Sequence, residues 1–307
     1  MPTSPASTAS PRPNQTIYAV ANVAGSCGKT TTAVNLAIAL AAQGVRVRII
    51  DLDPQANGST QLGYPGRTAD VTIADVLREQ VSIDDAERPA RVRVEIDYNT
   101  GKPIYSDDPA SLIANLTIVP AVRSTLDQVT IELNSAGLEG IMRLRDALEN
   151  ATPADVTLID SPGTMSVLVT NALIATTIEQ KPPPGSWGVI TCTKPAGKEA
   201  EGIQELVKQL SILKRRVQLD VPLLAIVPCA VPERGLVYQD QLGYLKDGFG
   251  ELVTPIVRRS AIVDEAYSDY LPVSLVGYRA KPIISDYSEV LAHLQKQGLF
   301  RPTAVNA

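Results

Sequence analysis

The segment at residues 23–32, Val-Ala-Gly-Ser-Cys-Gly-Lys-Thr-Thr-Thr, constrains the fold of this chain more than any other segment. An apolar run at 17–23 precedes it and predicts a buried strand, and residues 33–42 after it predict a helix. A strand, a turn that contains glycine, and Gly-Lys-Thr at the start of a helix are typical of a phosphate-binding P-loop. Free backbone N–H groups and the helix dipole attract phosphate at such a helix start. The chain is therefore expected to bind ATP with Mg²⁺.

Within this loop, Lys29 is expected to reach the β- and γ-phosphates and to serve catalysis, and the Thr30 hydroxyl to bind Mg²⁺. The common spacing G-x-x-x-x-G-K-[ST] is not met, because its first glycine would fall on Val23. The variant K-G-G-x-G-K-T fits in part, with Ala24 in place of its lysine and Ser26 in place of its second glycine. The residues expected to contact the nucleotide are Gly25, Ser26, Cys27, Gly28, Lys29, Thr30 and Thr31, with Pro228 and Cys229 at the end of a strand predicted over 222–228.

Acidic residues follow two further predicted strands. Asp51 and Asp53 come after an apolar run at 45–50, and Asp160 ends the run at 155–160. Residues two apart on an extended segment point the same way, and ligands bind at the carboxyl ends of parallel strands. Asp51 and Asp160 are therefore metal-ligand candidates. The second acid has the Walker B arrangement, in which an aspartate at a strand end holds Mg²⁺ through water.

Composition excludes several other classes of protein. The net charge of −5 excludes a bulk polycation, so any contact with nucleic acid has to come from a local basic patch. Three widely spaced cysteines argue against a disulfide framework and a zinc site, and a single histidine leaves little for histidine-based metal or acid–base chemistry. The sequence has no apolar run long enough to span a bilayer, so a cytoplasmic location and no membrane partner are expected.

Strands and helices alternate along the chain. This pattern predicts an α/β fold, a doubly wound and mainly parallel sheet with helices on both faces. Residues 1–15 are predicted to be a disordered lead, 16–300 a single P-loop ATPase domain, and 301–307 a flexible tail. Further strands are predicted over 116–122 and 187–193, and helices over 71–80, 123–134, 137–149, 199–215, 235–246 and 284–297.

Residues 91–106 predict a β-hairpin, because both arms alternate in polarity around a turn that contains Gly101. One face of the first arm would carry charged residues and the other apolar ones, beginning with Val92 and Val94. A hairpin alone is only marginally stable, so the apolar face is expected to pack on the body of the subunit, or else on a partner.

With these motifs in place, the chain resembles the ParA/Soj family of deviant-Walker partition ATPases over about residues 17–294, and specifically the small members without an N-terminal DNA-binding domain. The most diagnostic block is Asp-Leu-Asp-Pro-Gln-Ala-Asn at 51–57, followed by Thr60. The blocks at 25–32, 158–162 and 200–202 agree, as does Arg259 followed by Asp-Glu-Ala at 264–266. The hairpin at 91–106 looks like an insertion relative to this family.

The resemblance implies an ATP hydrolase that forms an ATP-dependent homodimer and binds double-stranded DNA without sequence preference. It also implies a ParB-like centromere-binding partner that stimulates hydrolysis, a role in plasmid or chromosome partition, and association with the nucleoid in the ATP form. By position, Asp53 matches the acid that orients the attacking water. In the family, a lysine at the position of Ala24 reaches the phosphates of the other subunit. Lys194 and Lys198 are candidate replacements for it.

Candidate DNA contacts are Arg215 and Arg216 near the end of a predicted helix, and Arg258 and Arg259 in a loop. The first pair could equally complement the helix dipole. Two other functions remain open. A metabolic ATP-dependent synthetase of related fold would need a substrate site with its own polar groups. A MinD-like membrane ATPase would need a basic amphipathic C-terminal helix, which the end of this sequence fits poorly.

Overall fold

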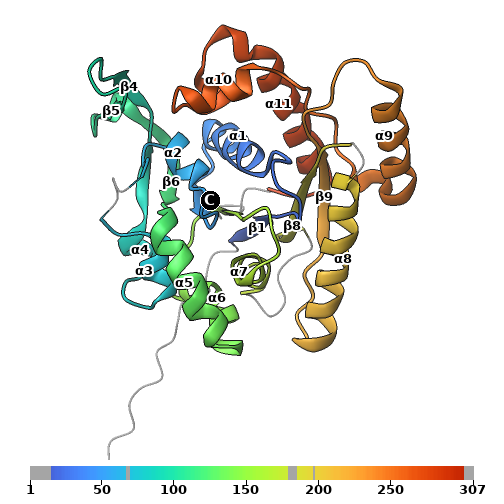
Figure 1. Ribbon diagram of the computed structural model, residues 1–307, viewed down its shortest axis with the longest axis horizontal. Helices are drawn as coiled ribbons and strands as arrows, with labels where there is room; N and C mark the ends of the chain where they lie inside the picture. The colour runs from blue at the N-terminus through green and yellow to red at the C-terminus, as the bar shows by residue number, and fades with distance from the viewer. Residues whose placement is uncertain (1–14, 67–69, 179–184, 196–197, 301–307) are drawn as a thin grey trace, which may run out of the picture.

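The computed structural model describes residues 15–66, 70–178, 185–195 and 198–300 (Figure 1). The described strands form a seven-stranded sheet in the order β3-β6-β2-β7-β1-β8-β9. All neighbours are parallel except β3, which pairs antiparallel with β6 at one edge. The strands of this sheet are β1 Thr16–Val20, β2 Val47–Asp51, β3 Arg88–Arg91, β6 Leu112–Val119, β7 Val156–Asp160, β8 Trp187–Thr193 and β9 Leu223–Pro228. The predicted α/β fold class is confirmed.

Helices cover both faces of the sheet because successive strand residues point to opposite sides. Tyr18 and Val20 pack with α1 (Lys29–Ala42) and α11 (Lys281–Lys296), whereas Ile17 and Ala19 pack on the other face. Figure 1 shows α1, α10 and α11 on one side and α5, α6 and α7 on the other. The helices of that second face are α3 Ile73–Leu77, α4 Ile83–Ala86, α5 Arg123–Ser135, α6 Leu138–Asn150, α7 Val167–Ala175 and α8 Lys198–Arg216.

The remaining helical elements follow β2 or β9 in the chain, except for a 3₁₀ turn at Pro109–Ser111 directly before β6. They are α2 Asn57–Gln61, α9 Leu236–Phe249, α10 Ile262–Ser268 and short 3₁₀ turns, among them η3 Val273–Leu275. Among the described residues, no helix is both long and apolar enough to cross a membrane. The predicted lead and tail lie outside the described residues, except for Gln15, which is buried.

Several predicted boundaries are wrong for physical reasons. The first strand ends at Val20 rather than at residue 23, because Asn22 already turns the chain by accepting a bond from the Val23 N–H at 2.6 Å. The predicted helix over 71–80 is only α3, which a Thr72 capping box starts and which ends at Leu77. The strand predicted over 116–122 is β6, which begins earlier and ends before Pro120.

The predicted hairpin is confirmed over residues 93–105, whereas Arg91, the first residue of the predicted range, ends a strand of the main sheet. Residues 88–91 form β3 of the main sheet, and only β4 Arg93–Ile96 and β5 Pro103–Tyr105 pair with each other. Val94 is 53% exposed and Tyr98 fully exposed, so the expected packing of the apolar face on the subunit body is wrong. The hairpin is instead tied to the body by polar contacts, including Tyr105 Oη to the Thr60 carbonyl at 3.4 Å and Arg93 to the Asp269 carbonyl.

Candidate nucleotide site

The P-loop runs from the end of β1 to the first residue of α1. Gly28 precedes the helix with φ of +96°, a left-handed conformation that favours glycine, and Ser26 is also left-handed with φ of +54°. A Cβ at Gly28 would lie 3.0 Å from the Cys229 side chain, so a glycine is required here on both counts. Among the described residues no side chain caps α1, so its first N–H groups have no side-chain partner there and are suited to bind a phosphate.

Lys29 lies at the centre of this loop and is 6% exposed. Its Nζ donates to the Ala24 carbonyl at 3.1 Å and lies 3.7 Å from Cys27 Sγ. Burial raises the pKa of the Cys27 thiol to about 11, although the Lys29 ammonium opposes the increase. Cys27 is thus a protonated, packed side chain of the loop, and contact of Lys29 with a phosphate stays a prediction.

Asp51 and Asp160 meet because β2 and β7 are parallel neighbours in a register that places these two residues side by side. A Cβ at Gly58 would lie 3.2 Å from Asp51 Oδ2 and 3.7 Å from Asp160 Oδ2, so both carboxyls face this glycine. Asp51 Oδ2 accepts from the Ser59 N–H and hydroxyl, both at 2.7 Å. Burial raises the pKa of Asp51 to about 6, despite these Ser59 bonds.

Asp160 is the less satisfied of the pair. Within the described part of the chain, both of its oxygens are buried without a hydrogen-bond partner. Burial and the neighbouring Asp51 raise its pKa well above the usual range, while the Thr30 hydroxyl and the Lys29 ammonium act in the opposite direction. An unpaired buried carboxylate is costly unless a cation compensates it. Hard oxygen ligands near a threonine hydroxyl suit Mg²⁺, so the residues present fit that ion.

Asp53 has a different environment from this buried pair. It lies just beyond β2 and is half-buried, and its Oδ1 accepts from the Gln55 N–H at 2.9 Å. Burial raises its pKa, and both the Gln55 bond and the Lys29 charge oppose that increase. The other carboxylate oxygen has no hydrogen bond from a described side chain or backbone group, so it could accept one from a water molecule, and Lys29 is close enough to interact with Asp53 electrostatically.

Pro228 and Cys229, at the end of β9, lie next to the P-loop, and the Cys229 side chain packs against Gly28. The Cys229 N–H donates to the Thr193 carbonyl at 2.7 Å, and its thiol lies 3.6 Å from Thr32 Oγ1. The thiol is buried and packs against Gly28, so in this conformation it contacts the inside of the loop. Nucleotide contact by Pro228 and Cys229 stays a prediction, as do the contacts assigned to Gly25, Ser26 and Thr31.

The predicted basic residues do not form one surface. Arg215 and Arg216 end α8, which runs back to the amino ends of the strands, whereas Arg258 and Arg259 follow β9 near the carboxyl ends. The Arg258 guanidinium is engaged by Asp286, with Nη2 at 2.7 Å from Oδ1. Arg259 is exposed. Lys194 is half-buried just after β8, and the side chain of Lys198 lies outside the described residues.

Sequence reasoning missed residues that hold the site together. Ser59 fixes Asp51 from a position eight residues later, for which the sequence gives no signal. A Cβ at Gly163 would lie 2.8 Å from Gly25 Cα, and one at Gly202 would lie 2.6 Å from Asn22 Oδ1. Gly163 lies in the turn after the predicted strand at 155–160, so a glycine at this place in the turn was the signal that the sequence offered. Close approach of the P-loop backbone explains the glycine at 163, and close approach of the Asn22 and Ala24 side chains explains the glycine at 202.

Comparisons with known proteins agree with this geometry. The family model described as an AAA domain matches residues 15–221. The chromosome partitioning protein ParA of Caulobacter vibrioides is 31% identical over 263 residues, which are 84% of this chain and 86% of the relative. The sporulation initiation inhibitor protein Soj of Bacillus subtilis is 27% identical, over 86% of this chain and 92% of Soj.

Solved structures share the fold at lower identity. The ATP complex of a McdA variant from Cyanothece superposes with a TM-score of 0.72 at 18% identity, over 93% of this chain and 97% of McdA. A plasmid partition protein of Borrelia burgdorferi bound to AMPPNP gives 0.68 at 17%, over 92% and 99%. Cobyrinic acid a,c-diamide synthase of Mycobacterium smegmatis, with ADP and magnesium, gives 0.67 at 23%, over 94% and 98%. By its sequence relatives and its P-loop architecture, the chain belongs to the ParA/Soj family of P-loop partition ATPases.

Proposed function

We propose that the chain is a Mg²⁺-dependent ATPase that acts as a molecular switch in plasmid or chromosome partition. The observation that carries this proposal is the buried pair of Asp51 and Asp160 beside the P-loop, in which both oxygens of Asp160 lack a partner among the described residues. Such a pair is stable in charged form only when a cation lies against it. Thr30, Asp51 and Asp160 would hold Mg²⁺, which would neutralise charge on the phosphate oxygens.

Lys29 and Asp53 have separate roles in hydrolysis: Lys29 binds phosphate and Asp53 positions the attacking water. Lys29 exchanges its bond with the Ala24 carbonyl for a phosphate oxygen, because a charge-assisted bond to phosphate is stronger than one to a neutral carbonyl. Asp53 accepts a hydrogen bond from the attacking water and orients it toward the γ-phosphate. Partial burial raises the pKa of Asp53, but the Gln55 N–H bond and the Lys29 ammonium both favour its charged form, the form that accepts a hydrogen bond from water.

The output of the switch is an ATP-bound homodimer that binds DNA through exposed cations such as Arg259. The ParA and Soj relatives, named for chromosome partitioning and sporulation control, support this assignment, as does the partition protein of similar fold. A ParB-like protein is the partner that stimulates hydrolysis in this scheme, and the ATP form lies on the nucleoid.

A synthetase function is disfavoured by one observation. The single histidine, His293, lies on α11 and pairs with the Glu251 carbonyl at 3.0 Å, away from the P-loop. Histidine is therefore not available for acid–base catalysis on a second substrate at the strand ends.

The test compares the wild type with Lys29→Ala in ATP turnover, in sedimentation with DNA, and in dimer formation, each with ATP and with ADP plus Mg²⁺. We expect DNA binding and dimerisation of the wild type with ATP only, and neither in the variant. An exposed lysine provides the matched control, Lys208→Ala, which should behave as the wild type. Equal DNA binding in the ADP and ATP states would contradict the switch.

A further inference from the structure

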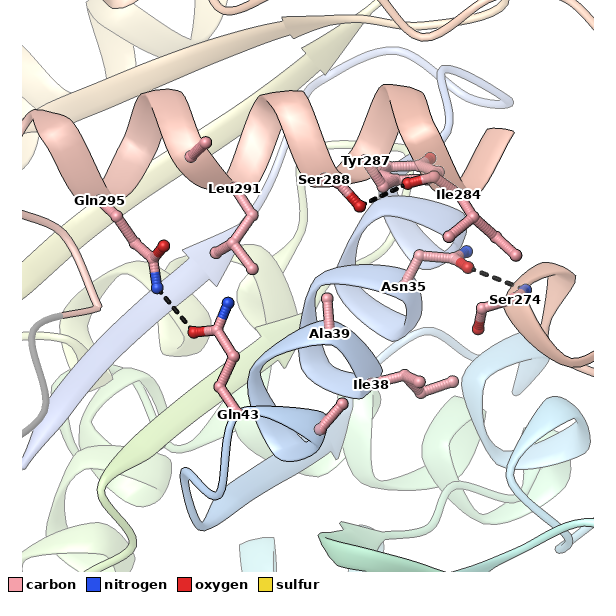
Figure 2. Close-up of a pocket in the computed structure, with 12 residues that line it drawn as sticks. Asn35, Ile38, Ala39, Gln43, Ser274, Ile284, Tyr287, Ser288, Leu291 and Gln295 are labelled. Atoms are coloured by element: carbon pink, nitrogen blue, oxygen red, sulfur yellow. Dashed lines mark hydrogen bonds between the residues drawn. The ribbon is translucent and has the colours of Figure 1, made fainter. Parts of the chain in front are cut away.

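A cavity lies between α1 and α11 on the face of the sheet away from α5–α8 (Figure 2). Its volume is about 420 Å³, which lies within the range of about 300–1,000 Å³ that is usual for small-molecule sites. Ile38 and Ala39 line it from α1, and Ile284 and Leu291 from α11. Figure 2 shows Gln43 and Gln295 joined by a hydrogen bond at one end and Asn35 joined to Ser274 at the other.

The lining of the cavity is uncharged and contains one buried hydroxyl without a partner among the described residues. None of the lining residues, all within the described part of the chain, is charged. Gln43 and Gln295 bond to each other through one polar atom each, both polar atoms of the Asn35 side chain bond to the backbone, and the Ser288 hydroxyl donates to the Ile284 carbonyl at 2.8 Å. The Ser274 hydroxyl differs from these groups, because it is buried without a partner among the described residues. A buried hydroxyl that makes no hydrogen bond is unfavourable, and a ligand oxygen would remove that cost.

The cavity also touches the nucleotide site through two bonds. The ring of Tyr287 lines it, and the Tyr287 hydroxyl lies 3.3 Å from Thr32 Oγ1, three residues beyond Lys29. Asn35 Nδ2 donates to the Thr31 carbonyl at 2.7 Å. A molecule that displaces the Tyr287 ring or Asn35 therefore moves the first turn of α1, whose N–H groups face the phosphates.

We propose that this cavity binds an uncharged, mainly apolar small molecule with one hydrogen-bond-accepting oxygen, and that its occupancy changes nucleotide affinity. Charge is excluded because the lining offers no counter-charge, and an uncompensated ion would be desolvated at high cost. Ser274 donates to the ligand oxygen, and the apolar walls cover the rest of the molecule. The effect of occupancy on nucleotide affinity rests on the proposed nucleotide function. Binding of a ligand in the cavity does not.

The site itself is tested on the nucleotide-free protein with prodan, a neutral naphthalene ketone whose emission shifts to the blue in apolar surroundings. We expect saturable one-to-one binding. Ala292→Trp, at an exposed lining position of α11, should weaken it at least tenfold, whereas Ala136→Trp, exposed at the end of α5, should not. Ser274→Ala should weaken it by about 3- to 10-fold, the loss of one hydrogen bond, whereas Ser288→Ala should not.

Two outcomes would overturn the site. One is prodan binding that does not saturate or that Ala292→Trp leaves unchanged. The other is equally tight binding of the anionic probe 1-anilinonaphthalene-8-sulfonate, which would contradict an uncharged ligand. Thermal unfolding of each variant checks that the fold is intact.

The coupling is tested by repeating the titration with saturating ATPγS and Mg²⁺. We expect ATPγS to change the dissociation constant of prodan at least threefold. Prodan should then change the dissociation constant of ATPγS by the same factor. In Tyr287→Phe, each ligand should leave the dissociation constant of the other almost unchanged. Unchanged constants with ATPγS bound would overturn the coupling. Failure of ATPγS to bind at all would contradict the proposed function and the coupling, whereas saturable prodan binding would still support the cavity as a site.

Discussion

Two buried aspartates in this protein have opposite surroundings. Asp160, at the end of β7, is fully buried, and neither of its oxygens accepts a hydrogen bond of ordinary geometry from a described residue, although the Thr30 hydroxyl lies near enough to oppose the rise in its pKa. Asp286, on α11, is 4% exposed and accepts three kinds of bond from Arg258: its backbone N–H at 2.9 Å, Nε at 2.9 Å and Nη2 at 2.7 Å. The two side chains have similar burial and the same chemistry, but only one is compensated within the chain.

This difference separates a structural role from a functional one. A buried carboxylate with a bidentate arginine holds two segments together, here the loop after β9 and α11. A buried carboxylate with no partner lowers the stability of the isolated protein and is explained by something that binds from outside. Activity and stability are therefore expected to respond in opposite ways at the two positions.

The largest expected effect is at Asp160. Asp160→Asn should lower Mg²⁺-dependent ATP turnover by about 100-fold or more, because a metal ligand is lost. The same variant should raise the free energy of unfolding of the nucleotide-free protein by about 1–3 kcal/mol at pH 8. Turnover against Mg²⁺ concentration and chemical unfolding measure the two effects. If Asp160→Asn is less stable than the wild type and still active, Asp160 is not a ligand of the catalytic Mg²⁺.

The stability gain at Asp160 should depend on pH with a definite sign. The folded-state pKa of Asp160 is raised, so the folded protein retains a proton that the unfolded chain releases above its usual pKa near 3.8. The wild type therefore loses stability as the pH rises toward the raised pKa, and Asp160→Asn does not. The stability advantage of Asp160→Asn should grow as the pH rises above about 4 in unfolding curves taken without Mg²⁺.

Asp53→Ala should lower turnover by about 100-fold, the usual contribution of a group that accepts a hydrogen bond or proton from the reacting water, while ATPγS affinity changes little. The variant should accumulate as the ATP-bound dimer, which size-exclusion chromatography with ATP would show. Asp127→Ala, an exposed acid on α5, is the matched control. Loss of ATPγS affinity together with turnover would place Asp53 with the metal ligands instead.

Ala24→Lys tests whether a second cation is missing from the loop. The Ala24 carbonyl now accepts from Lys29, and its methyl group faces Gly202 of α8. If the family's lysine was never replaced, Ala24→Lys should raise turnover with DNA and partner by about tenfold, through added charge stabilisation in the transition state. If Lys194 or Lys198 substitutes for it, the gain should be absent, and Lys194→Ala, Lys198→Ala or both should instead lower turnover.

Asp286→Asn should lower the free energy of unfolding by about 1–2 kcal/mol and leave ATP turnover within about twofold. The loss should be moderate because the Arg258 side chain is 42% exposed, so water replaces part of the lost pairing. Chemical unfolding with and without Arg258→Ala in a double-mutant cycle isolates the pair. A large loss of turnover would mean that the loop after β9 also shapes the nucleotide site.

The smallest effect concerns DNA. Arg259→Ala should weaken ATP-dependent DNA binding by about threefold and lower the salt slope by about one, because an exposed cation is lost. Arg258→Ala should change DNA binding less, since Asp286 already neutralises that charge. Arg215→Ala with Arg216→Ala probes the other end of the sheet. If this double variant weakens DNA binding more than Arg259→Ala does, the DNA-binding surface lies at the amino ends of the strands.

The sequence determined the parts of this protein that depend on neighbours along the chain. The P-loop, the strand ends at Asp51 and Asp160, and both helices of the pair α5 and α6 follow from local patterns, and the structure places them within a few residues of expectation. Local backbone sterics, periodic burial and helix starts act over a few residues, so a single sequence carries them.

Only the tertiary structure decided which distant groups meet. The register of β2 against β7 places Asp51 beside Asp160, and the packing of α11 on α1 brings Tyr287 to Thr32. Arg258, expected to be free for DNA, is held by Asp286, and the apolar face of the hairpin is exposed instead of packed. These outcomes depend on strand order and on contacts between segments up to hundreds of residues apart. Burial and compensation of charge are properties of that arrangement and not of any one segment.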